Sequence, residues 1–176
     1  MNLLDLEQPK EMPEVFYAVI EIPKGSHNKY EMDHETGLIE LDRVLYSPFF
    51  YPTDYGFIPR TWSQDEDPLD VMVLVHDPTF PGCIVKVRPV ALFKMRDEKG
   101  VDEKVLAVPV KEPRFEEIKD LEDVPQHVLK EISHFFQRYK ELEKGKFSEV
   151  LGWEGKESAL KLIRECMKRY EETRHV

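Results

Sequence analysis

Short runs rich in β-branched and aromatic residues, most of them closed by a proline, a glycine or a charged turn, make up much of the chain as far as Val110. Such runs favour β-strands, because branched and aromatic side chains pack well on a pleated surface. The pattern predicts strands at 15–22, 38–45, 71–75, 83–93 and 104–110, with a shorter extended segment at 29–32. Several strands at this close spacing are typical of a small antiparallel barrel.

The last part of the chain changes to helical spacing. Apolar residues recur three and four positions apart over 128–142, which predicts a helix of about five turns. Pro125 is a start signal for this helix, and Gly145 is a stop signal. A second apolar stripe over 159–170 predicts another helix. Strands followed by two helices predict an α+β fold with the barrel at its centre.

We expect one domain, 1–176, because 176 residues are enough for one core and too few for two domains of typical size. Hydrophobic residues make up 41% and charged residues 34%, which fits a globular protein and argues against disorder. No apolar run approaches the roughly 18 residues of a membrane helix, so no membrane partner is expected. The acidic first residues do not resemble a secretory signal, and we therefore expect a cytoplasmic protein.

The net charge and the cysteines narrow the classes of partner further. A formal net charge of −10 disfavours a nucleic-acid binder, whose affinity would depend on Lys and Arg contacts to phosphates. An acidic protein can still bind an anion when metal ions mediate the contact. Cys83 and Cys166 stand in no Cys-x-x-Cys or Cys/His spacing, so we expect buried free thiols rather than a disulfide or a zinc site.

Four carboxylates crowd together just before the apolar run at 71–75, and they belong to Asp65, Glu66, Asp67 and Asp70. Residues two apart in an extended chain share a face, so Asp65 and Asp67 point the same way. Pro68 disfavours helical geometry and lets the chain turn, which brings Asp70 back toward the other two aspartates. Three convergent carboxylates suit a hard divalent ion such as Mg²⁺ or Mn²⁺, whereas a solvated acidic turn is the plain alternative.

A second acidic cluster, Asp97 and Asp102, flanks the turn at Gly100, although turn acids of this kind are more often solvated than bound. Cations and hydroxyls stand nearby in strand ends and loops, at Lys29, Arg43, Lys104, Tyr51 and Tyr55. Either tyrosine would also fit a core ring whose hydroxyl meets a backbone carbonyl. Carboxylates bind divalent ions, and cations and hydroxyls bind phosphate oxygens, so the combination indicates metal-assisted phosphoryl transfer.

A signature motif and six further segments resemble one enzyme family. The stretch 65–71, DEDPLDV, resembles the D-x-D-P-x-D signature of the family I, Mg²⁺-dependent soluble inorganic pyrophosphatases of prokaryotic type. The other segments are EIP at 21–23, KYE at 29–31, LDR at 41–43, FYPTDYGFI at 50–58, KMRDEKGVDEK at 94–104 and HFFQRYKELEKGKF at 134–147. Together they extend the resemblance through nearly the whole chain.

The resemblance implies an OB-type fold, a five-stranded closed antiparallel β-barrel with two main helices packed outside. It implies an inorganic diphosphatase that hydrolyses pyrophosphate to two orthophosphates by in-line attack of a metal-activated water or hydroxide. The implied cofactor is Mg²⁺, several ions at once, with Mn²⁺ as a substitute. Prokaryotic members are typically homohexamers. Because Arg138 replaces a second histidine beside His134 on the helix associated with subunit packing, we expect subunit contacts to differ in detail.

By the same resemblance, Asp65, Asp70 and Asp102 hold one activating metal ion, and Asp70 also reaches a second. The sites for metal ions that arrive with the substrate are completed by Asp97, Asp102, Glu21 and Glu31. The implied phosphate contacts are Lys29, Arg43, Tyr55, Lys104, Tyr139 and Lys140, and Tyr51 is a further candidate. Asp67 is the implied general base, Glu66 is expected to be solvated, and Asp54, which stands where an asparagine is common, is not expected to bind metal.

A calcium-binding module and a nucleic-acid-binding barrel are the two alternative functions, because each shares one feature with this sequence. A non-catalytic calcium-binding module also uses D-x-D spacing, but the acidic stretch lacks the central glycine and terminal glutamate of an EF-hand loop. A nucleic-acid-binding barrel predicts a basic, aromatic-lined groove, whereas the loops of this chain are acidic.

Overall fold

The structure is a computed structural model that describes residues 2–174. The strands are β1 (Phe16–Ile22), β2 (Asn28–Met32), β3 (Ile39–Val44), β4 (Asp54–Phe57), β5 (Asp70–Val73), β6 (Ile84–Asp97), β7 (Gly100–Pro109) and β8 (Ser148–Gly155). The helices are α1 (Gln126–Arg138) and α2 (Lys156–Arg174), and short 3-10 helices lie at Leu3–Asp5, Pro113–Phe115 and Leu121–Asp123. The α+β class is therefore confirmed. Within the described residues, no helix is both long and apolar enough to cross a membrane.

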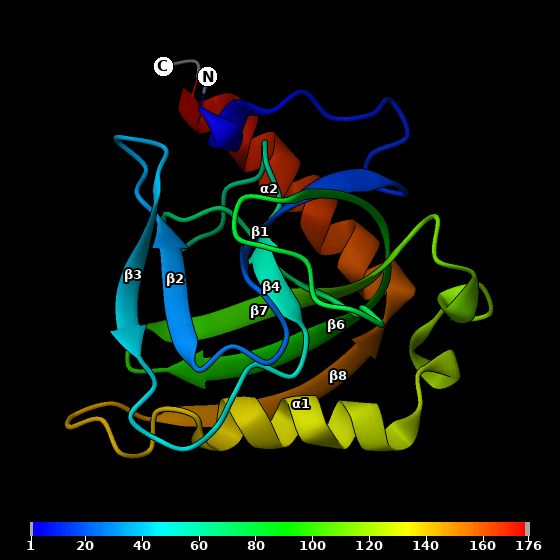
Figure 1. Cartoon of the computed structure of the whole chain (residues 1–176). Coiled ribbons are helices and arrows are strands. Elements are labelled where there is room, and N and C mark those ends of the chain that lie inside the picture. The colour runs from blue at the N-terminus through cyan, green and yellow to red at the C-terminus, as the bar shows by residue number, and fades with distance from the viewer. Residues whose placement is uncertain (1, 175–176) are drawn as a thin grey trace.

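Five strands close into a ring. In the order β1, β4, β5, β7 and β6, each strand pairs with the next, and β6 pairs back with β1. β8 extends this sheet along β6, while β2 and β3 form a separate hairpin beside the ring (Figure 1). The helix α1 lies below the sheet in this view and α2 crosses behind it. The closure by five strands and the two external helices agree with the fold predicted from the sequence.

One pairing in the ring departs from the antiparallel prediction. β5 and β7 run parallel, with Asp70 beside Lys104 and Val73 beside Ala107, whereas the other pairings of the ring are antiparallel. The long strand β6 separates β5 from β7 along the chain, so β7 enters the pairing in the same direction as β5. Side-chain periodicity does not report relative strand direction. The parallel pairing matters for function because it places Lys104 next to Asp70.

The strands β1 and β4 approach each other closely at Gly56. A Cβ atom at this position would lie 1.8 Å from the carbonyl oxygen of Val19, so any larger residue would push the two strands apart. The close approach fixes the backbone next to Gly56, including that of Tyr55, whose side chain reaches the candidate site described below.

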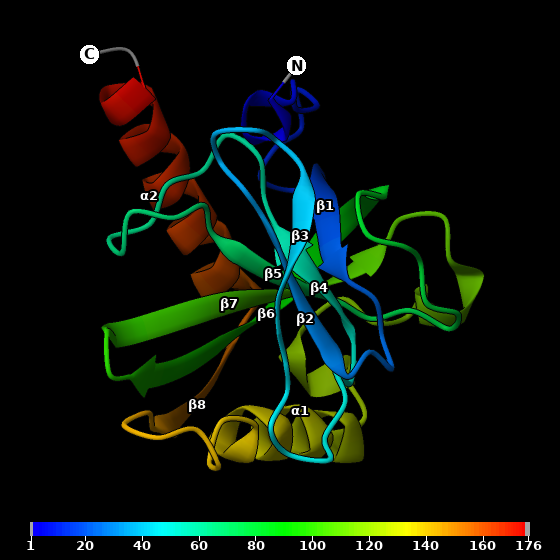
Figure 2. The same cartoon turned by 60° about the vertical axis from the view of Figure 1, so that its left-hand side comes forward.

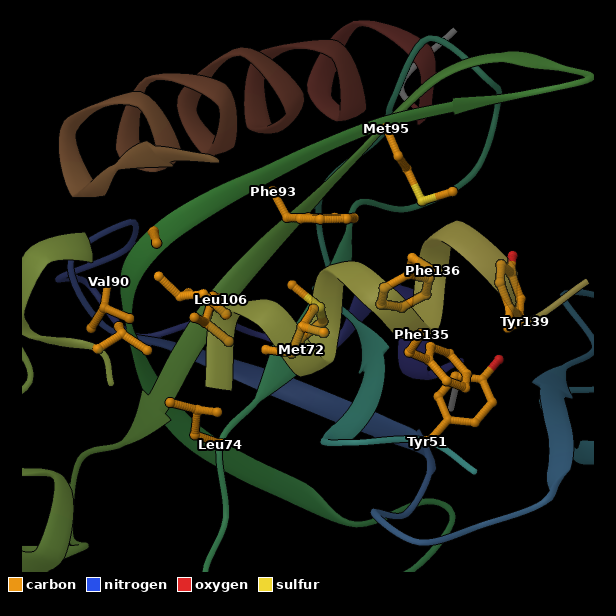
Figure 3. Close-up of a cluster of buried hydrophobic side chains, with 14 of the residues drawn as sticks. Tyr51, Met72, Leu74, Val90, Phe93, Met95, Leu106, Phe135, Phe136 and Tyr139 are labelled. Atoms are coloured by element: carbon orange, nitrogen blue, oxygen red, sulfur yellow. The ribbon is translucent and has the colours of Figure 1, made fainter. Parts of the chain in front are cut away.

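Two buried clusters lie on opposite faces of the ring strands. Neighbouring residues such as Val71 and Met72 belong to different clusters, because successive side chains of a strand point to opposite faces. The helix α1 packs Phe135 and Phe136 into the first cluster (Figure 3), and α2 packs Ile163 into the second. Burial on both faces explains why the strand at 71–75 is a continuous apolar run. Each fully buried large apolar side chain contributes about 1.5–3 kcal/mol relative to an exposed one.

The helix α1 ends at Arg138, earlier than the predicted end at Leu142. After Tyr139 the chain continues as tight turns, in which the amide of Glu141 donates to the carbonyl of Arg138 and the amide of Glu143 donates to the carbonyl of Lys140. The apolar spacing over 128–142 therefore spans a helix and the turns that follow it. These turns direct Lys140 toward the β6–β7 hairpin.

The strands β8 and β4 were not predicted. β8 pairs with β6 along the outer edge of the sheet and carries no fully buried residue, so its sequence lacks the clear apolar alternation of a half-buried strand. β4 lies inside the aromatic stretch 50–58, where Gly56 and two flanking prolines suggested turns.

The two cysteines are free thiols in different environments. Cys166 is buried, as predicted, and burial raises the pKa of its thiol to about 11. Cys83 is only half-buried, so the prediction of burial is wrong for this residue, which lies in the loop just before β6.

Candidate active site

A cavity of about 250 Å³ is lined by residues of the β2–β3 hairpin, the loop before β5, the β6–β7 hairpin and the chain after α1. Figures 1 and 2 show the arrangement of these backbone elements. Among the described residues, every predicted site residue lines this cavity except Tyr51. Residues that lie far apart in the sequence, such as Glu21, Asp67 and Lys140, therefore share one space. The fold brings the two predicted acidic clusters and the predicted cations together, as metal-assisted phosphoryl transfer requires.

The acidic stretch forms a loop that closes on itself. The amide and the hydroxyl of Ser63 both donate to the carbonyl oxygen of Asp67, at 2.7 Å and 3.1 Å. The amide of Asp67 in turn donates to the carboxylate of Asp65 at 3.3 Å. Glu66, at φ 64°, occupies the left-handed region at the tip, and it does not line the cavity. The loop thus presents Asp65 and Asp67 to the cavity and leaves Glu66 outside, as the sequence predicted.

We call the carboxylates that line the cavity its acidic wall. The ammonium group of Lys104 lies between two of them. Its Nζ atom is 3.0 Å from Asp70 Oδ2, 2.9 Å from Asp102 Oδ2 and 2.7 Å from the hydroxyl of Tyr55. Burial alone would lower the pKa of Lys104, but the carboxylates of Asp102 and Asp70 hold it well above its ordinary value. Lys104 is therefore a permanent cation at this position. Burial, reinforced by Asp70 and opposed by Lys104, raises the pKa of Asp102.

A second acidic group comes from β1 and β2. Glu21 accepts a hydrogen bond of 2.8 Å from the amide of Met32, which holds its carboxylate against the hairpin. Burial, with a smaller contribution from Asp70, raises the pKa of Glu21 to about 8. On β2, Lys29 lies 3.3 Å from Asp42 and 3.7 Å from Glu31.

Other predicted cations of the cavity, Arg43 and Lys140, are also paired with carboxylates. Arg43 Nη1 lies 2.6 Å from Asp42 Oδ2, and Arg43 Nε lies 2.8 Å from Glu143 Oε1. Lys140 Nζ lies 3.1 Å from both Asp97 and Glu98. The carboxylates behind these cations hold them in place without removing their positive charge.

Glu143 is the main residue that the sequence reasoning missed. Its side chain is only 4% exposed, and it binds Lys146 at 3.1 Å as well as Arg43. Helical spacing gives no signal for it, because Glu143 lies in the turns that follow α1. Glu98, Lys99 and Lys146 also line the cavity without having been predicted.

Tyr51 lies behind the cavity wall rather than in it. Its side chain is buried, with its ring 4.7 Å from Phe135 and 5.6 Å from Tyr55 between centroids. Figure 3 shows Tyr51 and Tyr139 at the same end of the buried cluster, next to Phe135. Of these residues, Tyr55 and Tyr139 line the cavity. Burial raises the pKa of Tyr51 well above its ordinary value, so it is a neutral phenol.

Asp54 has a structural role. It is fully buried, and its carboxylate accepts hydrogen bonds from the amides of Lys24 at 2.8 Å and Thr79 at 3.2 Å. These bonds tie two loops to the start of β4. This placement accords with the expectation that Asp54 does not bind metal.

The donor set of the cavity fits a hard divalent cation. Its acidic side chains offer oxygen only, which is the preference of Mg²⁺. Burial and neighbouring carboxylates raise the pKa values of Glu21, Asp65 and Asp102, so each would gain from a cation beside it. Within residues 2–174, no three acidic, His or Cys side chains are gathered closely enough to enclose an ion. The ammonium of Lys104 instead lies between Asp70 and Asp102.

Comparison with known proteins agrees with this chemistry. The profile of the inorganic pyrophosphatase family matches residues 18–171. An inorganic pyrophosphatase of Haloferax volcanii is 54% identical over 168 residues, covering 96% of this chain and 95% of that protein. One from Geobacillus stearothermophilus is 54% identical over 155 residues, covering 88% and 93%. The crystal structure of inorganic pyrophosphatase from Thermus thermophilus matches with a TM-score of 0.95 at 50% identity, covering 97% of this chain and 99% of that one. The chain therefore belongs to the inorganic pyrophosphatase family.

Proposed function

We propose that this protein hydrolyses inorganic pyrophosphate to two orthophosphates in the cavity of about 250 Å³, with Mg²⁺ ions held by the acidic wall. The observation that carries the proposal is the meeting of acidic and cationic side chains in one space. Among the described residues, Glu21, Asp65 and Asp67 have no cation within ion-pair distance, while Arg43, Lys104 and Lys140 are held in place by carboxylates. Pyrophosphate is a compact polyanion, and both kinds of group are needed to bind it and neutralise it.

The residues that would hold the ions are Asp65, Asp70 and Asp102 for one, with Asp70 shared with a second, and Glu21, Glu31, Asp97 and Asp102 for ions that arrive with the substrate. Mg²⁺ bound there supplies positive charge to the phosphate oxygens and acidifies water. Mn²⁺ has similar ligand preferences and is the expected substitute.

Three cations of the cavity, Lys29, Arg43 and Lys140, would bind and orient the phosphates. Arg43 offers a planar fork of donors, and its contacts to Asp42 and Glu143 fix the plane of that fork. Lys29 and Lys140 are held by carboxylates in the same manner. These contacts limit the side-chain freedom that would otherwise be lost on binding.

Asp67 is suited to act as the general base. The hydrogen bonds that the structure gives Asp67 use its backbone amide and carbonyl, and its carboxylate faces the cavity. Burial and the nearby Asp65 raise the pKa of Asp67, which strengthens it as a proton acceptor. In the proposed step, Asp67 takes a proton from water as the water oxygen bonds to one phosphorus. The bond between that same phosphorus and the bridging oxygen breaks, and its electron pair stays on the bridging oxygen, which leaves as part of the second phosphate. The Lys and Arg side chains stabilise the charge of this leaving phosphate.

A single domain over 1–176, assembly into a homohexamer and a cytoplasmic location stay predictions of the sequence and of its resemblance. Large apolar side chains are exposed on and after β3, at Val44, Tyr46 and Phe50, and they supply a surface that subunits would cover. Light scattering by the purified protein measures the assembly directly.

The proposal is tested by measuring phosphate released from pyrophosphate by the purified protein. We expect two phosphates per pyrophosphate with Mg²⁺ present and none above background with excess EDTA. No release under any metal would favour a calcium-binding module instead. Salt-sensitive binding of single-stranded DNA by the metal-free protein would favour a nucleic-acid-binding barrel.

A further inference from the structure

A second, smaller cavity lies behind the acidic loop. It has a volume of about 100 Å³ and separates the loop from α2 and β7. Asp65 and Asp102 line both this rear cavity and the larger one in front. Two proposed metal ligands therefore have open space behind them instead of close packing, and something other than packing must fix their position.

The hydrogen bonds inside the loop fix its shape, but they do not fix its place on the protein. The buried Leu69 holds the far end of the loop, through its hydrogen bonds with Ile58 and Thr61. The near end is attached by Trp62, the residue just before the loop. The amide of Trp62 donates to the carbonyl of Cys166 at 3.0 Å, and the carbonyl of Trp62 accepts from Arg169 Nη1 at 3.0 Å. The helix α2 thus holds both backbone polar groups of the residue from which the loop starts.

The guanidinium of Arg169 also places a positive charge beside the rear cavity. Among the described residues that line the rear cavity it is the one cation, and the lining also contains Asp65, Asp102, Glu103 and Glu165. A fixed positive charge there offsets part of the repulsion among the carboxylates. Arg169 does not line the front cavity, so it has no place among the groups that would touch pyrophosphate.

We propose that Arg169 is a positioning residue for the metal site. By holding the carbonyl of Trp62 across the rear cavity, it sets where the loop presents Asp65 and Asp67, and Mg²⁺ binding at the front depends on this helix residue behind it. The inference rests on the proposed function, since it concerns how the same site is held.

The test compares three variants of the full chain. Arg169→Gln removes the charge and shortens the side chain, while Arg169→Lys keeps the charge and can still give one hydrogen bond to the Trp62 carbonyl. Arg164→Gln is the matched control, because Arg164 lies on the same helix, is exposed and, within the described residues, forms an ion pair only with Glu14, at 4.0 Å. Hydrogen exchange of the amides at 62–69 in metal-free protein reports the loop. Calorimetric titration with Mg²⁺ reports the metal site without any turnover.

We expect Arg169→Gln to speed exchange at Trp62 and Ser63 by about tenfold, the effect of one lost hydrogen bond, and to weaken Mg²⁺ binding by a similar factor. Arg169→Lys should fall between this variant and the unaltered protein, and Arg164→Gln should match the unaltered protein. Loop exchange and Mg²⁺ affinity that stay unchanged in Arg169→Gln would overturn the inference. If that variant does not fold, Arg169→Met, which keeps the apolar stem and removes the charge and the donors, takes its place, and unchanged exchange and Mg²⁺ affinity in Arg169→Met overturn the inference equally. An unaltered protein that binds no Mg²⁺ would instead overturn the proposed function. The exchange data would still test whether the hydrogen bond from Arg169 to the Trp62 carbonyl holds the loop in place.

Discussion

The ammonium nitrogen of Lys104 lies 3.0 Å from a carboxylate oxygen of Asp70, its direct partner across the parallel strands β5 and β7. The same nitrogen lies 2.9 Å from Asp102. A buried positive charge therefore stands where two proposed metal ligands meet. Without metal, Lys104 is the group that keeps these carboxylates from repelling one another, and it also presents a cation to the cavity.

Replacing Lys104 by methionine is expected to destabilise the metal-free protein by about 3 kcal/mol, because it leaves buried carboxylates without their partner. The loss applies fully at neutral pH, since the pKa of Lys104 is raised and the ion pair weakens only as the pH climbs past the ordinary lysine value. Added Mg²⁺ should restore part of the stability. Denaturant unfolding measures both effects.

The matched control for that experiment is Lys94→Met. Lys94 is more exposed, at 37% of its side chain, and its partners Glu103 and Glu154 lie at the surface of the sheet. A pair of this kind contributes less than about 1 kcal/mol. Equal losses of stability in the two variants would show that Lys104 holds no special place among the carboxylates.

Glu143→Gln is expected to raise the KM for pyrophosphate by about tenfold. The carboxylate that orients Arg43, by an ion pair and by accepting a hydrogen bond from Arg43 Nη2 at 3.2 Å, loses its charge in this variant. The kcat should fall less, because Glu143 lies behind the cations and not beside the reacting atoms. Steady-state kinetics separate the two constants. Glu141→Gln is the control, because Glu141 pairs with Arg138 at 2.9 Å on the exposed side of the same segment. A normal KM for Glu143→Gln would mean that Arg43 needs no support from this carboxylate.

The two tyrosines of the 50–58 segment should behave differently when changed to phenylalanine. Tyr55→Phe removes the 2.7 Å hydrogen bond to Lys104 and should lower kcat/KM by about tenfold. Tyr51→Phe should leave KM within about twofold of the unaltered protein, because the ring of Tyr51 packs behind the wall. A large rise in KM for Tyr51→Phe would instead support the direct phosphate contact that the sequence suggested.

The raised pKa of Glu21 predicts how stability depends on pH. Because the folded protein holds a proton on Glu21 between its ordinary pKa of 4.5 and about 8, while the unfolded chain does not, the free energy of unfolding should fall as the pH rises through this window. The slope is at most about 1.4 kcal/mol per pH unit. Unfolding of the metal-free protein at several pH values measures it. Glu21→Gln should flatten the profile, and an unaltered slope in that variant would assign it to other groups.

Particular elements show what the sequence could and could not predict. The helix α1 was predictable because its buried residues repeat at helical spacing. The strand β6 was predictable because its sequence is rich in β-branched residues, although residues 89–93 are buried in succession. β8 was not, since it lies at the edge of the sheet without a buried face. The parallel pairing of β5 with β7 escaped prediction because no local pattern carries strand direction.

For the candidate site, short motifs predicted nearly all the residues that line the cavity. Lys104 was predicted as a phosphate contact, but its place between Asp102 of its own strand and Asp70 depends on the pairing of β5 with β7. The burial of Glu143 depends in the same way on the turns after α1. What a motif supplies is the type of side chain, while the tertiary fold decides which charges become partners.

The central claim is that the acidic wall binds Mg²⁺ for pyrophosphate hydrolysis, with Asp70 as a shared ligand and Asp67 as the base. Its most direct test is the rate of phosphate release as a function of Mg²⁺ concentration for the unaltered protein, Asp70→Asn and Asp67→Asn. We expect Asp70→Asn to need far more Mg²⁺ for half-maximal activation, and Asp67→Asn to keep nearly the same Mg²⁺ dependence while its maximal rate falls at least about 100-fold. Unchanged activation by Mg²⁺ in Asp70→Asn, or a near-normal maximal rate in Asp67→Asn, would contradict this assignment of the two aspartates.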